Sequence, residues 1–148
     1  MSGLELSGTG YFTTEVQINA PRARVWQAFA THADFSQWFN HDPDWYLAVP
    51  RFDFRLGGGF RAEFGPTAHV YTEVCLYEEM EDERRIVMSS EMTEGTPYLC
   101  TRVTIQLEDK GSATKLTVRE DGIADADVED RRTGWGLTLN NLKRYLES

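Results

Sequence analysis

The chain has 148 residues and a net charge of −9, with 24 Asp and Glu against 15 Lys and Arg. A chain of this length buries roughly two-thirds of its unfolded surface, so it needs no disulfide or metal ion to fold. The acidic balance and the lack of any Lys/Arg run argue against binding to nucleic acids or to anionic membranes. No segment has the ~20 consecutive apolar residues of a membrane span, and residues 1–11 do not resemble a signal peptide. We therefore expect one cytoplasmic domain over residues 1–148, with residues 1–10 as an N-terminal tail.

The N-terminal third is predicted to contain one strand and two short helices. Residues 11–18 alternate between two faces with a period of two, which indicates a half-buried strand. Pro21 and the apolar residues from Val25 onward then predict a helix of about ten residues. Asp34 can cap a second short helix over residues 35–39. Residues 42–50, which include two prolines, are expected to form a loop.

Residues 51–120 are predicted to form six further strands in consecutive hairpins. The alternating segments are residues 51–56, 60–64, 69–77, 85–92, 98–107 and 114–120, separated by turn residues such as the three glycines at 57–59. In residues 69–77 the stronger apolar stripe is Val70, Val74 and Leu76. This stripe predicts that Glu73, on the opposite face, points away from the core.

The C-terminal segment, residues 125–146, is predicted to be a long helix. Its apolar stripe consists of Val128, Trp135, Leu139, Leu142 and Leu146. Acidic residues in the first turns and basic residues in the last turn suit the helix dipole. Gly134 and Gly136 flank Trp135, and we favour close approach of the helix to the sheet over a bend that opens a pocket.

Six short motifs carry a resemblance to a known family. They are INAP and VWQA within residues 18–28, FRLGGGFR at 54–61, YTEV at 71–74, TRVTI at 101–105 and GW at 134–135. In their order and spacing they resemble the SRPBCC superfamily, the START and birch-pollen-allergen-like proteins. The nearest branch is the one named after the activator of the 90-kDa heat-shock-protein ATPase. The resemblance implies an α+β helix-grip fold, in which a seven-stranded curved antiparallel sheet and two short helices surround a long C-terminal helix.

The same resemblance implies a cavity between the sheet and the C-terminal helix, and several aromatic residues fall on the elements that would surround it. Apolar concavities with few polar groups are where ligands bind, although the same side chains could instead form a plain aromatic core. The candidate ligand-binding residues are Trp38, Phe39, Phe54, Phe60, Tyr71, Glu120, Trp135 and Leu139.

Polar residues offer weaker candidates for chemistry. Glu120 shares the apparent inner face of its strand and, if buried, could act as an acid or base; alternatively it is solvated or paired with Arg61, Arg102 or Arg119. His41 has aspartates nearby but no metal-ligand spacing, so we expect a solvated histidine and no metal site. Cys75 and Cys100 are predicted to lie two strands apart, ~10 Å, and therefore to remain thiols.

These observations favour a protein that binds a small apolar ligand without a cofactor and without obvious catalysis. Two alternatives from other classes remain open. One is a co-chaperone domain with a chaperone partner, as the name of the branch implies. The other is a polyketide cyclase or dehydratase-type enzyme that uses a buried carboxylate.

Overall fold

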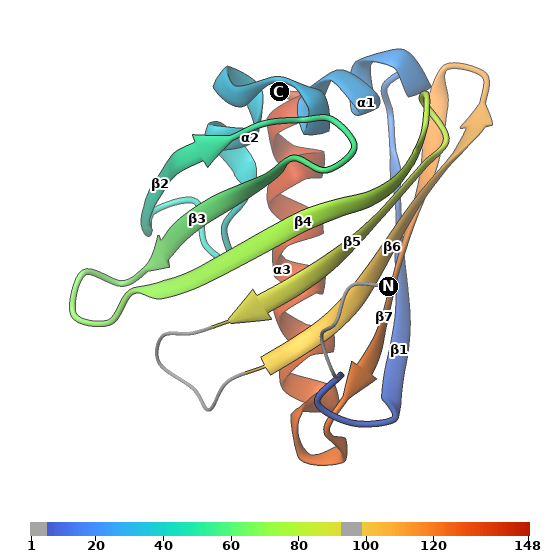
Figure 1. Ribbon diagram of the computed structural model, residues 1–148. Coiled ribbons are helices and arrows are strands. Elements are labelled where there is room, and N and C mark those ends of the chain that lie inside the picture. Colours follow the sequence, from blue (N-terminus) through green and yellow to red (C-terminus); the bar gives the residue numbers. More distant parts are fainter. Residues whose placement is uncertain (1–5, 93–98) are drawn as a thin grey trace.

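The computed structural model describes residues 6–92 and 99–148. It has a seven-stranded antiparallel sheet, two short helices and one long C-terminal helix, which confirms the predicted α+β helix-grip fold (Figure 1). The strands are β1 (Gly10–Ile18), β2 (Tyr46–Phe52), β3 (Gly59–Gly65), β4 (Tyr71–Glu81), β5 (Arg85–Met92), β6 (Leu99–Lys110) and β7 (Ala113–Ile123). The helices are α1 (Arg22–Ala30), α2 (His32–Trp38) and α3 (Val128–Glu147), and a 3-10 turn, Asp125–Asp127, precedes α3.

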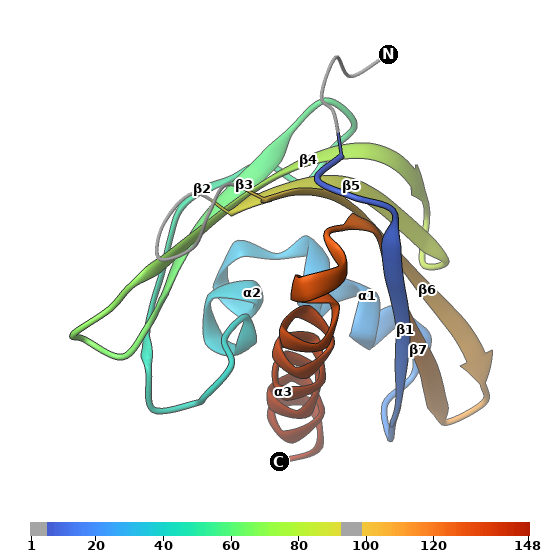
Figure 2. The same ribbon diagram turned by 90° about the horizontal axis from the view of Figure 1, so that it is seen from below.

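The sheet curves around α3. Its strand order is β1-β7-β6-β5-β4-β3-β2, so β2 to β7 form consecutive hairpins and β1 pairs with β7. Figure 2 shows the sheet as an arch with α3 on its concave side, and α1 and α2 lie on the same side. Side chains alternate across each strand, so one face of every strand points toward the helices. The apolar stripe of α3 supplies the other half of the core, and Leu139 and Leu142 are fully buried.

The second strand begins earlier than the sequence indicated. We expected a loop over residues 42–50 and a strand over 51–56, whereas β2 spans Tyr46–Phe52. Pro50 fits because β2 is an edge strand and its pairing with β3 shifts register between Ala48 and Arg51. Phe54 and Leu56 therefore lie in the β2–β3 connection and not on a strand.

The second helix also begins earlier than expected. It starts at His32, with Thr31 in the N-cap position, so Asp34 lies inside the first turn. The Asp34 carboxylate accepts hydrogen bonds from Arg24 of α1, at 3.1 Å, and from the hydroxyl of Tyr145 of α3, at 2.5 Å. Asp34 therefore joins three helices instead of capping one.

The prediction for the two faces of β4 was wrong. The face that carries Glu73 was expected to point away from the core, but it is the inner face. Glu73, Cys75 and Tyr77 are buried, whereas Leu76 is 41 % exposed. The prediction failed because it weighed only the apolar residues of the strand. A buried carboxylate on the inner face is stable when a cation pairs with it, and the structure supplies that cation from α3.

Aromatic side chains fill the space between α2 and the strands β2 and β3. The Phe35 ring lies 4.6 Å from that of Phe39 and 4.8 Å from that of Phe60, measured between ring centroids. Trp38 is almost fully buried and donates its indole N–H to the carbonyl of Ala28 at 3.0 Å. This part of the concave side is therefore a packed core.

The two cysteines lie on either side of β5. Cys75 of β4 is opposite Ser90, and Cys100 of β6 is opposite Glu91. Both are buried thiols, as the predicted strand order required.

Of the helices within the described ranges, none is long and apolar enough to cross a lipid bilayer.

Candidate functional site

The most unusual feature of the interior is a buried cluster of charged side chains. Arg131, on the first turns of α3, contacts Glu120 of β7 and Glu73 of β4. Its Nη2 atom lies 2.7 Å from Oε2 of Glu120 and 3.4 Å from Oε2 of Glu73. The exposed fractions of the three side chains are 11 %, 0 % and 4 %, in the order Arg131, Glu120, Glu73. The cluster ties the N-terminal half of α3 to two strands of the sheet.

Both carboxylate oxygens of Glu120 accept hydrogen bonds. Oε1 accepts from the indole N–H of Trp135 at 3.1 Å and from Nε of Arg131 at 3.2 Å. Oε2 accepts from the hydroxyl of Thr101 at 2.5 Å in addition to Arg131. A fully buried carboxylate requires this number of donors, because each missing partner would cost free energy. Glu120 is therefore a structural anchor for Arg131 and Trp135.

Among the described residues, hydrogen-bond donors contact only one of the two carboxylate oxygens of Glu73. Its Oε2 atom accepts a hydrogen bond from the hydroxyl of Ser90, lies 3.9 Å from the sulfur of Cys75, and forms the longer contact to Arg131. Its Oε1 atom accepts no hydrogen bond from any residue that the structure describes. This oxygen is not fully buried, so a molecule in solution can reach it. The exposed part of Glu73 lines a pocket.

Burial and neighbouring charge shift two pKa values in this cluster. Burial alone would lower the pKa of Arg131, but the carboxylates of Glu120 and Glu73 outweigh it and raise that pKa. Arg131 is therefore always protonated. Burial, reinforced by the negative charge of Glu73, raises the pKa of the Cys75 thiol well above its ordinary value. Cys75 consequently stays neutral and is a poor nucleophile.

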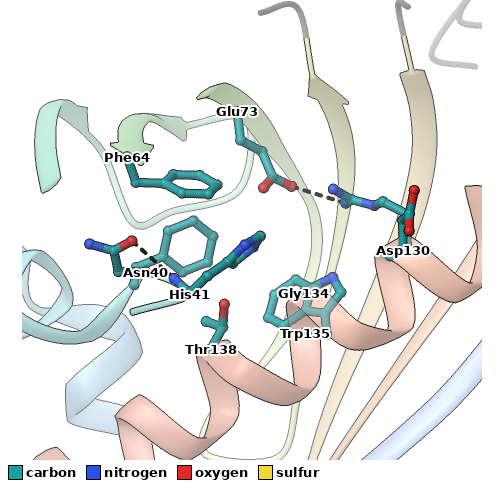
Figure 3. A pocket seen from close by; sticks show the side chains of 10 residues that line it. Asn40, His41, Phe64, Glu73, Asp130, Gly134, Trp135 and Thr138 are labelled. Carbon is teal, nitrogen blue, oxygen red and sulfur yellow. Dashed lines mark hydrogen bonds and ion pairs between the residues drawn. The ribbon is translucent and has the colours of Figure 1, made fainter. Parts of the chain in front are cut away.

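The pocket next to Glu73 lies between α3, the α2–β2 loop and the strands β3 and β4 (Figure 3). Its volume is about 30 Å³. The space admits water-sized groups and is far smaller than a benzene-binding cavity of ~150 Å³. Rings and polar groups both contribute to its wall, which consists of Phe39, Asn40, His41, Phe64, Glu73, Asp130, Arg131, Gly134, Trp135 and Thr138.

His41 is part of this wall and is not the solvated loop histidine that the sequence led us to expect. Its ring lies 5.0 Å from the Phe64 ring and 5.9 Å from the Trp45 ring, between centroids. Burial lowers the pKa of His41; Glu73 raises it by less, and Arg131 lowers it further. The imidazole is therefore neutral at pH 7.

The two glycines of α3 have different roles. A Cβ atom on Gly134 would lie 3.0 Å from two atoms of the His41 ring, so this glycine lets the α2–β2 loop approach the helix. A Cβ atom on Gly136 would meet nothing within 4 Å. The close approach expected from the sequence therefore occurs at Gly134 only, and its partner is a loop histidine and not the sheet.

The predicted ligand-binding residues are divided between the pocket and the core. Phe39 and Trp135 line the pocket, and Glu120 lies behind it, bonded to Arg131 and Trp135. Tyr71 is beside the pocket, with its ring 5.9 Å from that of Phe64. The remaining four do not line the pocket and pack in or against the hydrophobic core: Trp38, Phe54, Phe60 and Leu139.

Sequence reasoning missed Arg131, Glu73 and His41. Arg131 could have been found, because it stands three residues after Val128 and four before Trp135, where the helical stripe has a gap of seven. An arginine on the buried face of a helix requires a carboxylate opposite, which would have pointed to Glu73 and Glu120.

No group of His, Cys, Asp and Glu in residues 6–92 and 99–148 is arranged to hold a metal ion.

Three comparisons with known proteins agree with this architecture. The family model described as "Activator of Hsp90 ATPase homolog 1-like protein" matches residues 19–147. Protein CV1439 from Chromobacterium violaceum is 23 % identical with a TM-score of 0.82, covering 93 % of this chain and 97 % of its own. The Mll3558 protein from Rhizobium loti is 27 % identical with a TM-score of 0.74, covering 93 % of this chain and 96 % of its own.

A further similar structure is DynU16, described as a putative protein in the dynemicin biosynthetic locus. It is 24 % identical, with a TM-score of 0.73, and the match covers 93 % of this chain and 47 % of that protein. At this identity the likeness concerns the fold alone. No curated protein matches the chain.

Proposed function

Because the chain belongs to the family of activator of Hsp90 ATPase homolog 1-like proteins, within the SRPBCC superfamily, we propose that it binds a small molecule between the sheet and α3. The family's fold is compatible with ligand binding. The observation that carries the proposal is the pocket beside Glu73, where three aromatic rings meet polar side chains around a space that protein atoms do not fill.

The volume of the pocket limits the width of the ligand group that can enter it. A space of about 30 Å³ accepts a narrow group, such as one end of an alkyl chain, and excludes an aromatic ring. The group that enters the pocket contacts Phe39, Phe64 and Trp135 in this proposal. The rest of the ligand lies at the mouth, where Asp130 is exposed.

The two other candidate functions have less support from the contacts. Glu120 as a general acid or base is disfavoured, because both of its oxygens are occupied by donors. For a chaperone partner, an exposed apolar patch would be expected. The large exposed apolar side chains of the described residues are Leu6, Tyr11, Tyr46, Leu56, Leu76 and Leu137, and none of them lines the pocket.

Saturation-transfer NMR with 1-butanol, a neutral probe with a narrow chain, tests the proposal. The wild-type protein should transfer magnetisation to the butyl chain. Gly134→Ala places a methyl group against His41 and should weaken binding at least tenfold, because the ring must move. Gly136→Ala, two residues away with open space around it, is the matched control and should bind as the wild type does. Equal transfer in all three proteins would place the butanol elsewhere and refute this site.

A further inference from the structure

The charges of the buried cluster do not balance. Two carboxylates, Glu73 and Glu120, share one guanidinium, that of Arg131. Arg131 is the only Lys or Arg among the described residues that line the pocket. His41 is neutral at pH 7, and Asp130 at the mouth adds negative charge. One negative charge of the cluster is therefore left without a protein counter-charge in the pocket wall.

The hydrogen bonds assign this excess charge to Glu73. Arg131 makes contacts of 2.7, 3.1 and 3.2 Å to Glu120 but only one contact of 3.4 Å to Glu73. Of the two carboxylates, Glu120 thus makes the shorter and more numerous contacts with Arg131. The unbonded oxygen of Glu73 points toward His41 and Phe64 in Figure 3, away from the dashed ion pair. A side chain that is 4 % exposed thus offers a free acceptor to the pocket.

The walls around this acceptor suit a cation. Phe39, Phe64 and Trp135 line the pocket together with Glu73. Aromatic faces attract ammonium groups, and the attraction grows when the ammonium is removed from water. A volume of about 30 Å³ admits a narrow group such as CH₂–NH₃⁺ and is far below the ~150 Å³ of a cavity that holds a benzene ring.

We infer that the ligand of this site is a primary or secondary amine, bound as its ammonium form. The ammonium group enters the pocket and donates a hydrogen bond to Oε1 of Glu73, with the aromatic rings around it. The carbon chain of the amine extends through the mouth past Asp130. This inference rests on the proposed function and adds the chemical class of the ligand.

Three probes of one size test the charge preference: butylammonium, 1-butanol and butyrate, titrated by NMR at pH 7 in 0.15 M NaCl. The salt screens the general attraction between a cation and an acidic protein. We expect butylammonium to bind at least tenfold more tightly than 1-butanol, and butyrate to bind most weakly. If 1-butanol or butyrate binds as tightly as butylammonium, the inference is wrong while the proposed function stands. If none of the three binds, both are wrong.

Two variants test whether Glu73 causes the preference for butylammonium over 1-butanol. Glu73→Gln keeps the side-chain volume and removes the charge, so it should abolish the tenfold preference for butylammonium over 1-butanol. Glu129→Gln removes the same charge from an exposed position on α3, where the side chain is 80 % exposed. This control should keep the preference. An unchanged preference in folded Glu73→Gln protein would overturn the assignment to Glu73, and the three-probe series on the wild type remains decisive should that variant fail to fold.

Discussion

Replacing Arg131 with methionine tests how much the buried cluster contributes to stability. Met has a similar length and no charge, so the substitution leaves Glu120, which is 0 % exposed, without its main counter-charge. Removing one partner of a buried ion pair typically costs ~3–5 kcal/mol. We expect a loss in this range, because three Arg131–Glu120 contacts of 3.2 Å or less are removed together. Urea unfolding followed by circular dichroism measures the change.

The neighbouring residue provides the control. Arg132 pairs with Glu129 at 3.5 Å on the exposed side of α3, and exposed pairs of this kind contribute ~0–1 kcal/mol. Arg132→Met should therefore cost less than ~1 kcal/mol. The combination of Arg131→Met with Glu120→Gln should cost at least ~1 kcal/mol less than the sum of the single variants, because the glutamine no longer needs a cation. A loss below ~1 kcal/mol for Arg131→Met would refute the buried ion pair.

Four further predictions concern single residues of the same region. Gly136→Ala should raise the free energy of unfolding by ~0.5–1 kcal/mol in urea, because alanine favours a helix interior and its methyl group meets no atom; a loss would mean that the helix is distorted there. Trp135→Phe should cost ~1–3 kcal/mol in the same assay, because Glu120 loses a donor at 3.1 Å, and no change would show that this bond is absent. Burial lowers the pKa of His41 below 6.5, so the unfolded chain binds the proton more readily than the native protein; the contribution of His41 to stability is complete above pH 6.5 and declines as the pH falls through 6.5 toward the native pKa. His41→Gln should flatten this part of the stability curve, and an NMR titration midpoint above 6.5 would contradict the reasoning. Cys75 should resist iodoacetamide at pH 8 in the native state, because burial raises its pKa, and two thiols should react after denaturation; rapid native alkylation of Cys75 would show that the inner face of β4 is open.

The fold was predictable because periodicity and turns determine it locally. Alternation in residues 11–18 and 114–120 and the stripe of α3 each identify an element, and hairpin order follows from short turns. The start of β2 was not predictable in this way, because a proline is tolerated only where the strand is at an edge, and edge position is a tertiary property.

The candidate site was predictable only in part. Phe39 and Trp135 line the pocket, as their aromatic character indicated, and Glu120 is buried as its strand pattern indicated. Glu73 was assigned to the wrong face, because a polar residue on an inner face is recognisable only together with its partner. That partner, Arg131, is 58 residues away in the sequence, and no local pattern joins the two.

The proposed function places a small molecule in the pocket beside Trp135. The indole N–H signal of Trp135 in a ¹H–¹⁵N NMR spectrum, assigned with Trp135→Phe, tests it most directly during titration with butylammonium. The indole of Trp38, bonded to Ala28 in the packed core, is the internal reference. We predict that the Trp135 signal shifts in a saturable manner while that of Trp38 stays in place. A Trp135 signal that does not move at saturating butylammonium, or moves no more than that of Trp38, would contradict the claim.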